Sequence, residues 1–319
     1  MQIIKDRLFS INKPSVVTIG KFDGIHIGHR KLISEAVKAG KSEYCSVVFT
    51  FDMSPSDFFN TAQKMIYTNE EKEMILFECD VDYVIEYPFD SHIANMTPEE
   101  FVQELLVKKL NASKVIVGND FHFGKNRSGN PEILKNLSEK YGIEAVILSK
   151  ECINNTEVSS SLIRECLSEG KLEEANEMLS RPYSISGTVI SGNKLGRTLD
   201  MPTINLKPAE NKLLPPNGVY TSLVIYDNKT YAGVTNIGHK PTAPGVNALG
   251  VETYIMDFDK DIYGEQVTVM LLHHQRPEKK FSSLDELTVQ MKKDKELAKE
   301  NIENIIHRSF RDGFLQSEI

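Results

Sequence analysis

Two histidines lie three positions apart, His26 and His29, in the run VVTIGKFDGIHIGHR over residues 16–30. An apolar, strand-like run ends at Gly20, and a helical pattern begins near His29. Side chains three positions apart at the start of a helix share one face. Both imidazoles can therefore contact one ligand, beside the unpaired N–H groups of the helix start. The spacing predicts a site for a ligand that contains phosphate.

Three glycines, Gly20, Gly24 and Gly28, flank the same turn. None has a Cβ atom, so we expect the backbone to approach a ligand closely there. A metal site is the alternative for a histidine pair, but zinc needs three or four ligands. The sequence places no third ligand nearby and contains no HExxH motif, which disfavours zinc.

The elements that must position these residues alternate between strand-like and helix-like runs through the first half of the chain. Such alternation predicts a parallel sheet that is covered on both faces. Ligands bind at the carboxyl ends of parallel strands, and His26, His29 and Asn119 all follow such ends. The predicted strands span residues 16–20, 46–51, 82–87, 114–119 and 144–149, with helical patterns between them, two of which have N-cap signals at Thr97-Pro98 and Asn130-Pro131.

The pattern changes at Arg181-Pro182, after which short β-branched runs follow one another without helices between them. This pattern predicts an antiparallel sheet or a small barrel, followed by a long closing helix over 284–310. We therefore expect two domains, residues 1–180 and 181–319. The strand-like runs of the second domain span residues 183–190, 222–238 (a hairpin that turns at Asp227-Asn228), 251–258 and 265–274.

Composition limits the partners and the location of the protein. The net charge of −8 over 319 residues disfavours a nucleic-acid partner. No run approaches the roughly 18–20 apolar residues of a membrane span, and the N-terminal residues lack the apolar core of a secretory signal. The four cysteines form no CxxC pair, which is typical of reduced thiols. We expect a cytoplasmic protein, monomeric or weakly homo-oligomeric, with small-molecule substrates.

The run GKFDGIHIGH, residues 20–29, resembles the HxGH signature of the nucleotidyltransferase superfamily, in the form seen in bacterial FAD synthetases. These enzymes are the bifunctional riboflavin kinase/FMN adenylyltransferases. Two later segments strengthen the resemblance: VIVGNDFHFGKNRSG (115–129) is similar to their second nucleotide-binding segment, and EVSSSLIR (157–164) is similar to their serine motif. In that motif Ser161 stands where the family usually has threonine.

The resemblance implies a Rossmann-like nucleotidyltransferase domain in which the FMN phosphate attacks the α-phosphorus of ATP. His26 and His29 would contact the triphosphate and the leaving pyrophosphate as catalytic residues. A turn-forming role is the alternative for Asp23, and an ordinary helix N-cap is the alternative for the serines. The ATP and phosphate contacts implied for this domain are Gly20, Phe22, Asp23, Gly24, Gly28, Asn119, Arg127, Ser159, Ser160, Ser161 and Arg164.

One departure from the family lies after the second predicted strand. The family has a Pro-His-Pro-like element there, whereas this chain has Met53-Ser54-Pro55 without a histidine. If the histidine helps to hold substrate, adenylyl transfer is slowed, altered or lost. This departure supports an alternative in which the chain is a monofunctional riboflavin kinase.

In the second half, SGNKLGRTLDMPTINL (191–206) resembles the riboflavin kinase motif, with Asp200 and Ile204 as departures. The segment is not a Walker A loop, because the spacing is one residue short and Arg197 stands in the lysine position. On an extended segment Thr203 and Asn205 face the same way. Their oxygens suit Mg²⁺, which takes its remaining ligands from water and ATP phosphates.

Glu252, in the strand-like run GVETYIMDF, matches the catalytic glutamate of the family. The resemblance implies a general base that takes the proton from the primary hydroxyl of riboflavin; a solvent-facing strand position is the alternative. The further contacts implied for ATP and flavin in this domain are Gly192, Lys194, Gly196, Arg197, Pro202 and Arg276.

The resemblance spans residues from about 15 to 290 and implies that the chain phosphorylates riboflavin to FMN and adenylylates FMN to FAD, using ATP and Mg²⁺. A flavin- or nucleotide-sensing binding protein is a second alternative, but a sensor needs no base such as Glu252. HIGH is also a signature of aminoacyl-tRNA synthetases. The lack of a KMSKS-like segment and the acidic charge disfavour that class.

Overall fold

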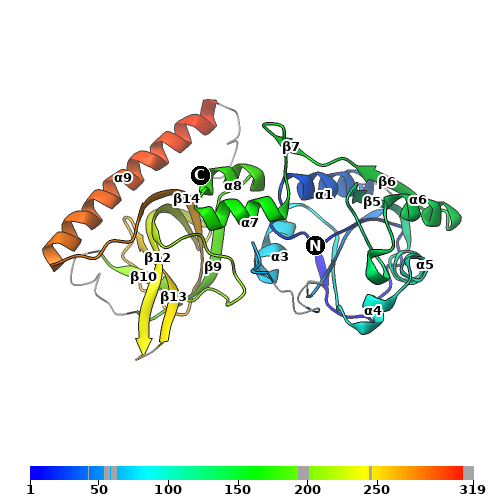
Figure 1. The fold of residues 1–319 in the computed structure, drawn as a ribbon, viewed down its shortest axis with the longest axis horizontal. Coiled ribbons are helices and arrows are strands. Elements are labelled where there is room, and N and C mark those ends of the chain that lie inside the picture. Colours follow the sequence, from blue (N-terminus) through cyan, green and yellow to red (C-terminus); the bar gives the residue numbers. More distant parts are fainter. Residues whose placement is uncertain (42, 54–57, 59–62, 193–200, 244–245, 312–319) are drawn as a thin grey trace. The chain divides into compact units, whose positions relative to one another are not determined.

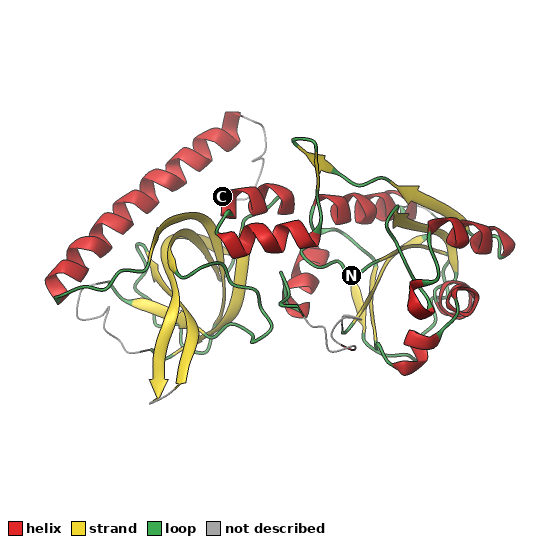
Figure 2. Cartoon of the chain, viewed as in Figure 1, coloured by secondary structure: helices red, strands yellow, loops and turns green. Residues whose placement is uncertain are grey.

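The computed structural model describes residues 1–41, 43–53, 58, 63–192, 201–243 and 246–311. The chain divides into two compact units, Met1–Ser160 and Ser161–Ile319, whose elements are labelled in Figure 1 and distinguished by type in Figure 2. The domain boundary predicted at residues 180 and 181 stays a prediction. Among the described residues, no helix is long and apolar enough to cross a membrane.

The first unit contains a six-stranded parallel sheet with the strand order β1-β4-β3-β2-β5-β6. The parallel sheet predicted for this half is therefore confirmed. The central strand β2 is buried along its whole length because a parallel sheet is covered on both faces. The edge strand β1 was not predicted, since three residues are too few to show a periodic pattern. The strands are β1 (Gln2–Ile4), β2 (Ser15–Ile19), β3 (Cys45–Phe51), β4 (Tyr83–Tyr87), β5 (Ala112–Gly118) and β6 (Glu144–Leu148).

The helices of this unit begin where their capping residues predict. Thr97 forms a capping box with Glu100 ahead of Pro98, and the Asn130 side chain accepts a hydrogen bond from the N–H of Ile133. The elements are α1 (Ile27–Gly40), α3 (Asn69–Glu78), α4 (Ser91–Asn95), α5 (Pro98–Phe101), the π-helix η1 (Val102–Lys109), the 3₁₀ turn η2 (Lys125–Arg127), α6 (Pro131–Lys140) and the short hairpin β7 (Cys152–Ile153) and β8 (Thr156–Glu157).

The helical segment after Thr97 differs from the single helix that its pattern predicts. After α5 it widens into η1, where the N–H of Leu110 donates to the carbonyl of Leu105, five residues earlier, at 2.9 Å. An apolar stripe does not distinguish this spacing from that of an α-helix, so the sequence contained no signal for it.

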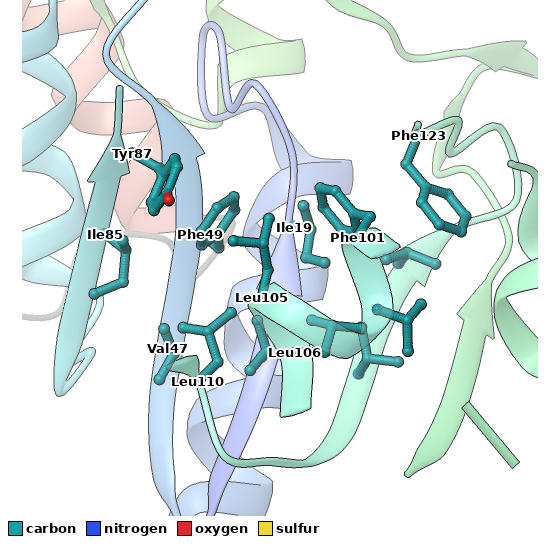
Figure 3. Packing of buried hydrophobic residues seen from close by; sticks show 14 of the residues in the cluster. Ile19, Val47, Phe49, Ile85, Tyr87, Phe101, Leu105, Leu106, Leu110 and Phe123 are labelled. Carbon is teal, nitrogen blue, oxygen red and sulfur yellow. The ribbon is translucent and has the colours of Figure 1, made fainter. Parts of the chain in front are cut away.

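The hydrophobic core of the first unit lies between the sheet and this helical segment. In Figure 3, Phe101, Leu105 and Leu106 pack beside Val47 and Phe49 of β3. All five are at most 3% exposed, and burial of each such side chain stabilises the fold by about 1.5–3 kcal/mol. This packing holds the central strands in place, and the carboxyl end of β2 begins the turn to α1.

The second unit contains a closed antiparallel barrel with the strand order β10-β13-β12-β11-β14-β9, as the pattern predicted. The hairpin between β11 and β12 turns at Asp227 and Asn228, whose φ angles of 52° and 57° are typical of the turn type that joins two-residue hairpins. The strands are β9 (Tyr183–Ile190), β10 (Thr203–Leu206), β11 (Gly218–Tyr226), β12 (Lys229–Ala243), β13 (Val246–Ile255) and β14 (Gln266–Pro277), and the helices are α7 (Ser160–Glu169), α8 (Leu172–Leu179) and α9 (Leu284–Arg311).

Helices α8 and α9 both pack on this barrel. Asn176 of α8 donates to the carbonyl of Leu271 at 3.0 Å and accepts from the N–H of Tyr183 at 2.7 Å. The long helix α9 runs along the outside of the barrel (Figure 1), and Asn301 donates to the hydroxyl of Thr221 at 3.0 Å. The outer face of β11 is thereby covered at Thr221, which is fully buried.

Candidate functional site

The turn between β2 and α1 has an unusual backbone. Phe22 and Ile25 have positive φ angles of 48° and 40°, and both side chains are fully buried. Positive φ is strained for bulky and β-branched residues, and such strain persists only where the surrounding packing enforces it. Gly24 has a φ of 87°, which glycine adopts without this cost. The turn thus ends with His26 at the N-cap of α1.

The two imidazoles that the sequence singled out lie face to face. The rings of His26 and His29 are stacked, with centroids 3.8 Å apart and planes 22° apart. Phe22 packs edge-on against His29, with centroids at 5.3 Å. The Nδ1 atoms of both histidines are buried and have no hydrogen-bond partner in the described part of the chain. The predicted pairing of the two rings at one helix start is therefore present, although its ligand stays a prediction.

The surroundings of both histidines disfavour the charged form of the imidazole. Burial lowers the pKa of His26 to about 4, opposed by the negative charge of Asp120. Burial also lowers the pKa of His29 well below its usual value, and the positive charges of His26 and Lys72 lower it further. Bound phosphate would add negative charge beside these rings and favour their protonated form.

Two of the three glycines have a packing role that the sequence did not suggest. A Cβ on Gly28 would lie 3.2 Å from Cε1 of His26, and a Cβ on Gly20 would lie 3.3 Å from Cζ of Phe22. The absent side chains therefore make room for the rings of the site itself. Their expected approach to a ligand stays a prediction.

Asp23 and Ser160 hold the turn in place. Asp23 Oδ1 accepts from the N–H of Ile66 at 3.0 Å, and the Asp23 carbonyl accepts from the Ser160 hydroxyl at 2.8 Å. Both contacts are long-range, so the two roles expected of Asp23, ligand contact and a local turn, stay predictions. The contacts also link the start of the serine motif to the histidine turn, within the first unit.

The other predicted contacts of this domain are spread over several elements. Asn119 follows β5, which pairs with β2, so both strands end at the same edge of the sheet. Arg127 is exposed in the basic turn η2. Ser159 also belongs to the first unit, whereas Ser161 and Arg164 belong to the second, so their relation to the histidines stays a prediction. Met53 is exposed, and Ser54 and Pro55 lie outside the described residues.

Lys72 is a charged residue near this site that sequence reasoning missed. It lies on α3 and is only 4% exposed. Burial lowers its pKa, opposed by the negative charges of Glu86 and Asp23. The helix shows no clear amphipathic pattern, so the sequence contained no sign that this lysine is buried.

In the second unit, the residues expected to hold Mg²⁺ and the expected base lie on paired strands. Asn205 of β10 is directly opposite Glu252 of β13, and the Thr203 hydroxyl donates to Glu252 Oε1 at 2.6 Å. Alternation along β10 places Thr203 and Asn205 on one face, as predicted. The three side chains thus present hydroxyl, amide and carboxylate oxygens together. Such hard oxygen donors fit Mg²⁺.

Gly192 contacts this cluster directly. A Cβ on Gly192 would lie 2.2 Å from Nδ2 of Asn205, closer than any real contact permits. Only glycine therefore fits beside the Asn205 amide. The flap residues Lys194, Gly196 and Arg197 lie outside the described residues, and their expected contacts with ATP stay predictions.

A cavity of about 520 Å³ adjoins this cluster. One wall contains Pro202, Thr203 and Ile204, and another is the loop 258–263 after β13. No local sequence pattern predicts this wall, because the approach of the loop to β10 depends on barrel closure. The loop brings Asp259, Lys260 and Asp261 to the lining, so two negative charges and one positive charge lie beside the cavity.

Arg276 is bound by the closing helix. Its Nε and Nη2 donate to the two carboxylate oxygens of Asp294 at 3.0 and 2.6 Å, and Asp294 is 4% exposed. This forked pair joins the end of β14 to α9. The ligand contact expected of Arg276 stays a prediction. Among the described residues, no group of three or more His, Cys, Asp or Glu side chains is arranged to hold a metal ion.

Two family models match the chain. The FAD synthetase model matches residues 8–162, and the riboflavin kinase model matches residues 179–302. The bifunctional riboflavin kinase/FMN adenylyltransferase of Escherichia coli strain K12 is 36% identical over 89% of this chain and 92% of its own length. The protein of the same name from Listeria monocytogenes is 34% identical over 92% and 94%.

A solved structure is similar along most of the chain. It is titled a macrolide-efflux protein from Streptococcus pneumoniae, and it matches with a TM-score of 0.82 and 32% identity. The match covers 93% of this chain and 98% of that one. The two-unit fold is therefore shared by a solved protein along nearly its whole length.

Proposed function

Because the chain belongs to the bifunctional riboflavin kinase/FMN adenylyltransferase family, we propose that it phosphorylates riboflavin to FMN and then transfers the adenylyl group of ATP to FMN, forming FAD. Its substrates are ATP, riboflavin and FMN. The barrel performs the first reaction and the Rossmann-like unit the second. The observation that supports this best is the hydrogen-bonded pair Thr203 and Glu252, with Asn205 opposite Glu252.

In the kinase reaction, the primary hydroxyl of riboflavin attacks the γ-phosphorus of ATP, the bond from that phosphorus to the β–γ bridging oxygen breaks, and ADP leaves. Glu252 accepts the proton of that hydroxyl, and the hydrogen bond from Thr203 keeps its carboxylate in one orientation. The phosphates lie on the side of Thr203 and Asn205, beside the cavity that Lys260 lines. Phosphoryl transfer depends mainly on positioning and on charge stabilisation, so an ordered polar cluster serves it well.

Mg²⁺ is part of this proposal. Thr203 Oγ1 and the amide oxygen of Asn205 would hold it together with ATP phosphates. The bound ion would neutralise charge that develops on the transferred phosphoryl group. Removal of Mg²⁺ by a chelator should stop FMN formation.

In the adenylyl transfer, the FMN phosphate is already ionised, so no general base is required. His26 and His29 lie at the start of α1, where their ring N–H groups would donate hydrogen bonds to the triphosphate of ATP and to the leaving pyrophosphate. Asp23, bound to the backbone of Ile66, keeps the turn rigid.

The purified protein is incubated with riboflavin, ATP and Mg²⁺, and FMN and FAD are separated. We expect FMN first and FAD later. FMN without FAD would establish the monofunctional alternative, and the absence of both would refute the proposal. A cytoplasmic location, a monomeric or weakly oligomeric state and the absence of a nucleic-acid partner remain predictions from the sequence.

A further inference from the structure

One row of residues crosses five strands of the barrel. Asn205 of β10 lies opposite Glu252 of β13, and Glu252 lies opposite Asn236 of β12. Asn236 in turn lies opposite Val219 of β11, and Val219 lies opposite Arg276 of β14. Residues directly opposite each other point to the same face of a sheet. The row therefore extends the Asn205–Glu252 cluster across the outer face of the barrel.

The neighbouring residues show which face is which. Thr235 and Thr253 flank Asn236 and Glu252 in sequence, are fully buried, and share a hydrogen bond of 2.9 Å in the barrel interior. Because successive residues alternate between faces, Asn236 and Glu252 point outward. Both residues are half-buried.

Within this row, Glu252 lies between Asn205 and Asn236. On one side lie Thr203 and Asn205, beside the cavity where the phosphate donor is proposed to bind. In-line transfer places the acceptor hydroxyl between the base and the phosphate, and the rest of the acceptor extends away from the donor. The side away from β10 is β12, and the first residue there is Asn236. Asn236 is therefore the first side chain on the path of an acceptor that extends away from β10.

The chemistry of Asn236 suits a chain of hydroxyl groups. A carboxamide offers two donors and one acceptor, and the Asn236 side chain makes no hydrogen bond within the described part of the protein. Two residues further along the same face, Gly238 and Gly250 lie opposite each other without side chains. The Glu278 carboxylate lies over Gly238, where a Cβ would be 1.9 Å from Oε1. Beside Glu252, this part of the barrel face therefore has a polar group and two positions without side chains.

We propose that Asn236 binds the sugar-alcohol chain of the acceptor, through a secondary hydroxyl next to the primary hydroxyl that Glu252 deprotonates. Neighbouring strands lie about 4.8 Å apart. At that spacing, Glu252 and Asn236 can contact adjacent hydroxyl groups of the same polyol chain. Asn236 thus selects acceptors with a hydroxylated chain. This inference depends on the riboflavin kinase activity proposed above.

The test compares two acceptors in the full-length protein. One is riboflavin, and the other is a flavin with an unbranched 5-hydroxypentyl chain, which keeps the primary hydroxyl but lacks the secondary ones. Asn236→Ala should lower kcat/KM for riboflavin about 10- to 100-fold, because a polar contact with the chain is lost. It should change kcat/KM for the hydroxypentyl flavin less than about twofold, since that substrate offers no partner to lose.

Two controls accompany the variant. Thr230→Ala, on an exposed position of the same strand, should leave both acceptors unaffected. Retained phosphorylation of the hydroxypentyl flavin shows that the barrel of the Asn236→Ala variant is folded. An equal loss for both acceptors, or no loss for either, would overturn the inference. If the wild-type protein phosphorylates neither acceptor, the kinase proposal itself fails, which is a different result.

Discussion

The Thr203 hydroxyl donates a 2.6 Å hydrogen bond to Oε1 of Glu252 across a pair of antiparallel strands. Neither residue is unusual in its own sequence context, since one follows a proline and the other lies in a β-branched run. Their contact results from the pairing of β10 with β13. The bond orients the Glu252 carboxylate beside Thr203.

Replacement of Glu252 by glutamine removes the proposed base. A carboxamide of similar shape cannot accept the proton of riboflavin, so FMN formation should fall by about 10²- to 10⁴-fold. FAD formation from supplied FMN should be unchanged, because it occurs in the other unit. Both rates are measured by separation of the flavins, and full kinase activity in this variant would remove Glu252 from the mechanism.

His29→Ala should have the opposite effect. Loss of one imidazole that stabilises the leaving pyrophosphate should slow FAD formation by about 10²-fold, while riboflavin is still converted to FMN. The same assay on the same samples measures both reactions. Unchanged FAD output would mean that the histidine pair has no catalytic role.

Gly192→Ala tests the contact with Asn205. The new Cβ would lie 2.2 Å from Asn205 Nδ2 and must displace the amide, so kinase activity should fall at least about tenfold. The matched control is Gly187→Ala on β9, where the nearest atom to a new Cβ is 3.8 Å away. Equal kinase rates in the two variants would show that the position of Asn205 is unimportant.

The burial of His26 predicts a pH dependence of stability. Its pKa is about 4 in the folded protein and about 6.5 in the unfolded chain. Between these values the unfolded chain binds the proton and the folded protein does not. The contribution of His26 is therefore fully present above pH 6.5 and falls as the pH falls towards 4, by an amount on the order of 3 kcal/mol.

The variant His26→Asn places a good N-cap residue at a position where the histidine makes no capping hydrogen bond, and it removes this titration. Urea unfolding of the first unit is monitored by hydrogen exchange in α1. Between pH 7 and pH 4.5, the free energy of unfolding should fall less in His26→Asn than in the wild-type protein. The control is His122→Asn, which changes an exposed histidine. A wild-type pH slope in His26→Asn would contradict the assignment.

Asp294→Ala tests the link between α9 and the barrel. It leaves the Arg276 guanidinium, whose side chain is 22% exposed, without its carboxylate. Loss of one partner of such a buried pair should lower the free energy of unfolding of the barrel by about 3 kcal/mol. Lys299→Ala, which breaks an exposed ion pair with Glu296 on the same helix, should cost at most about 0.5 kcal/mol. Denaturant titration measures both, and equal effects would contradict the proposed link.

Much of the fold was predictable because its signals are local. The buried strands of the first unit are continuous apolar runs, and Thr97-Pro98 and Asn130-Pro131 are helix starts whose hydrogen bonds lie within three residues. The strand β1 was missed because three residues contain no period. The wide turn of η1 was missed because its apolar spacing matches that of an ordinary helix.

The candidate sites divide in the same way. The stacking of His26 on His29 follows from their spacing, and the common face of Thr203 and Asn205 follows from strand alternation. The sequence contained no signal that Lys72 or Asn236 belongs to a site. Lys72 is notable because it is buried, and Asn236 because the register of β12 with β13 places it opposite Glu252. Such register brings together residues that are far apart in the chain.

The sequence by itself determined the two-part architecture, the histidine turn and the Thr203–Asn205 pair, since each depends on residues within a few positions of one another. Only the tertiary structure decided that Glu252 lies between Asn205 and Asn236, and that burial lowers the pKa of His26 and of His29. The physical reason is that strand register and desolvation are properties of the closed fold. Neither has a counterpart in a short stretch of sequence.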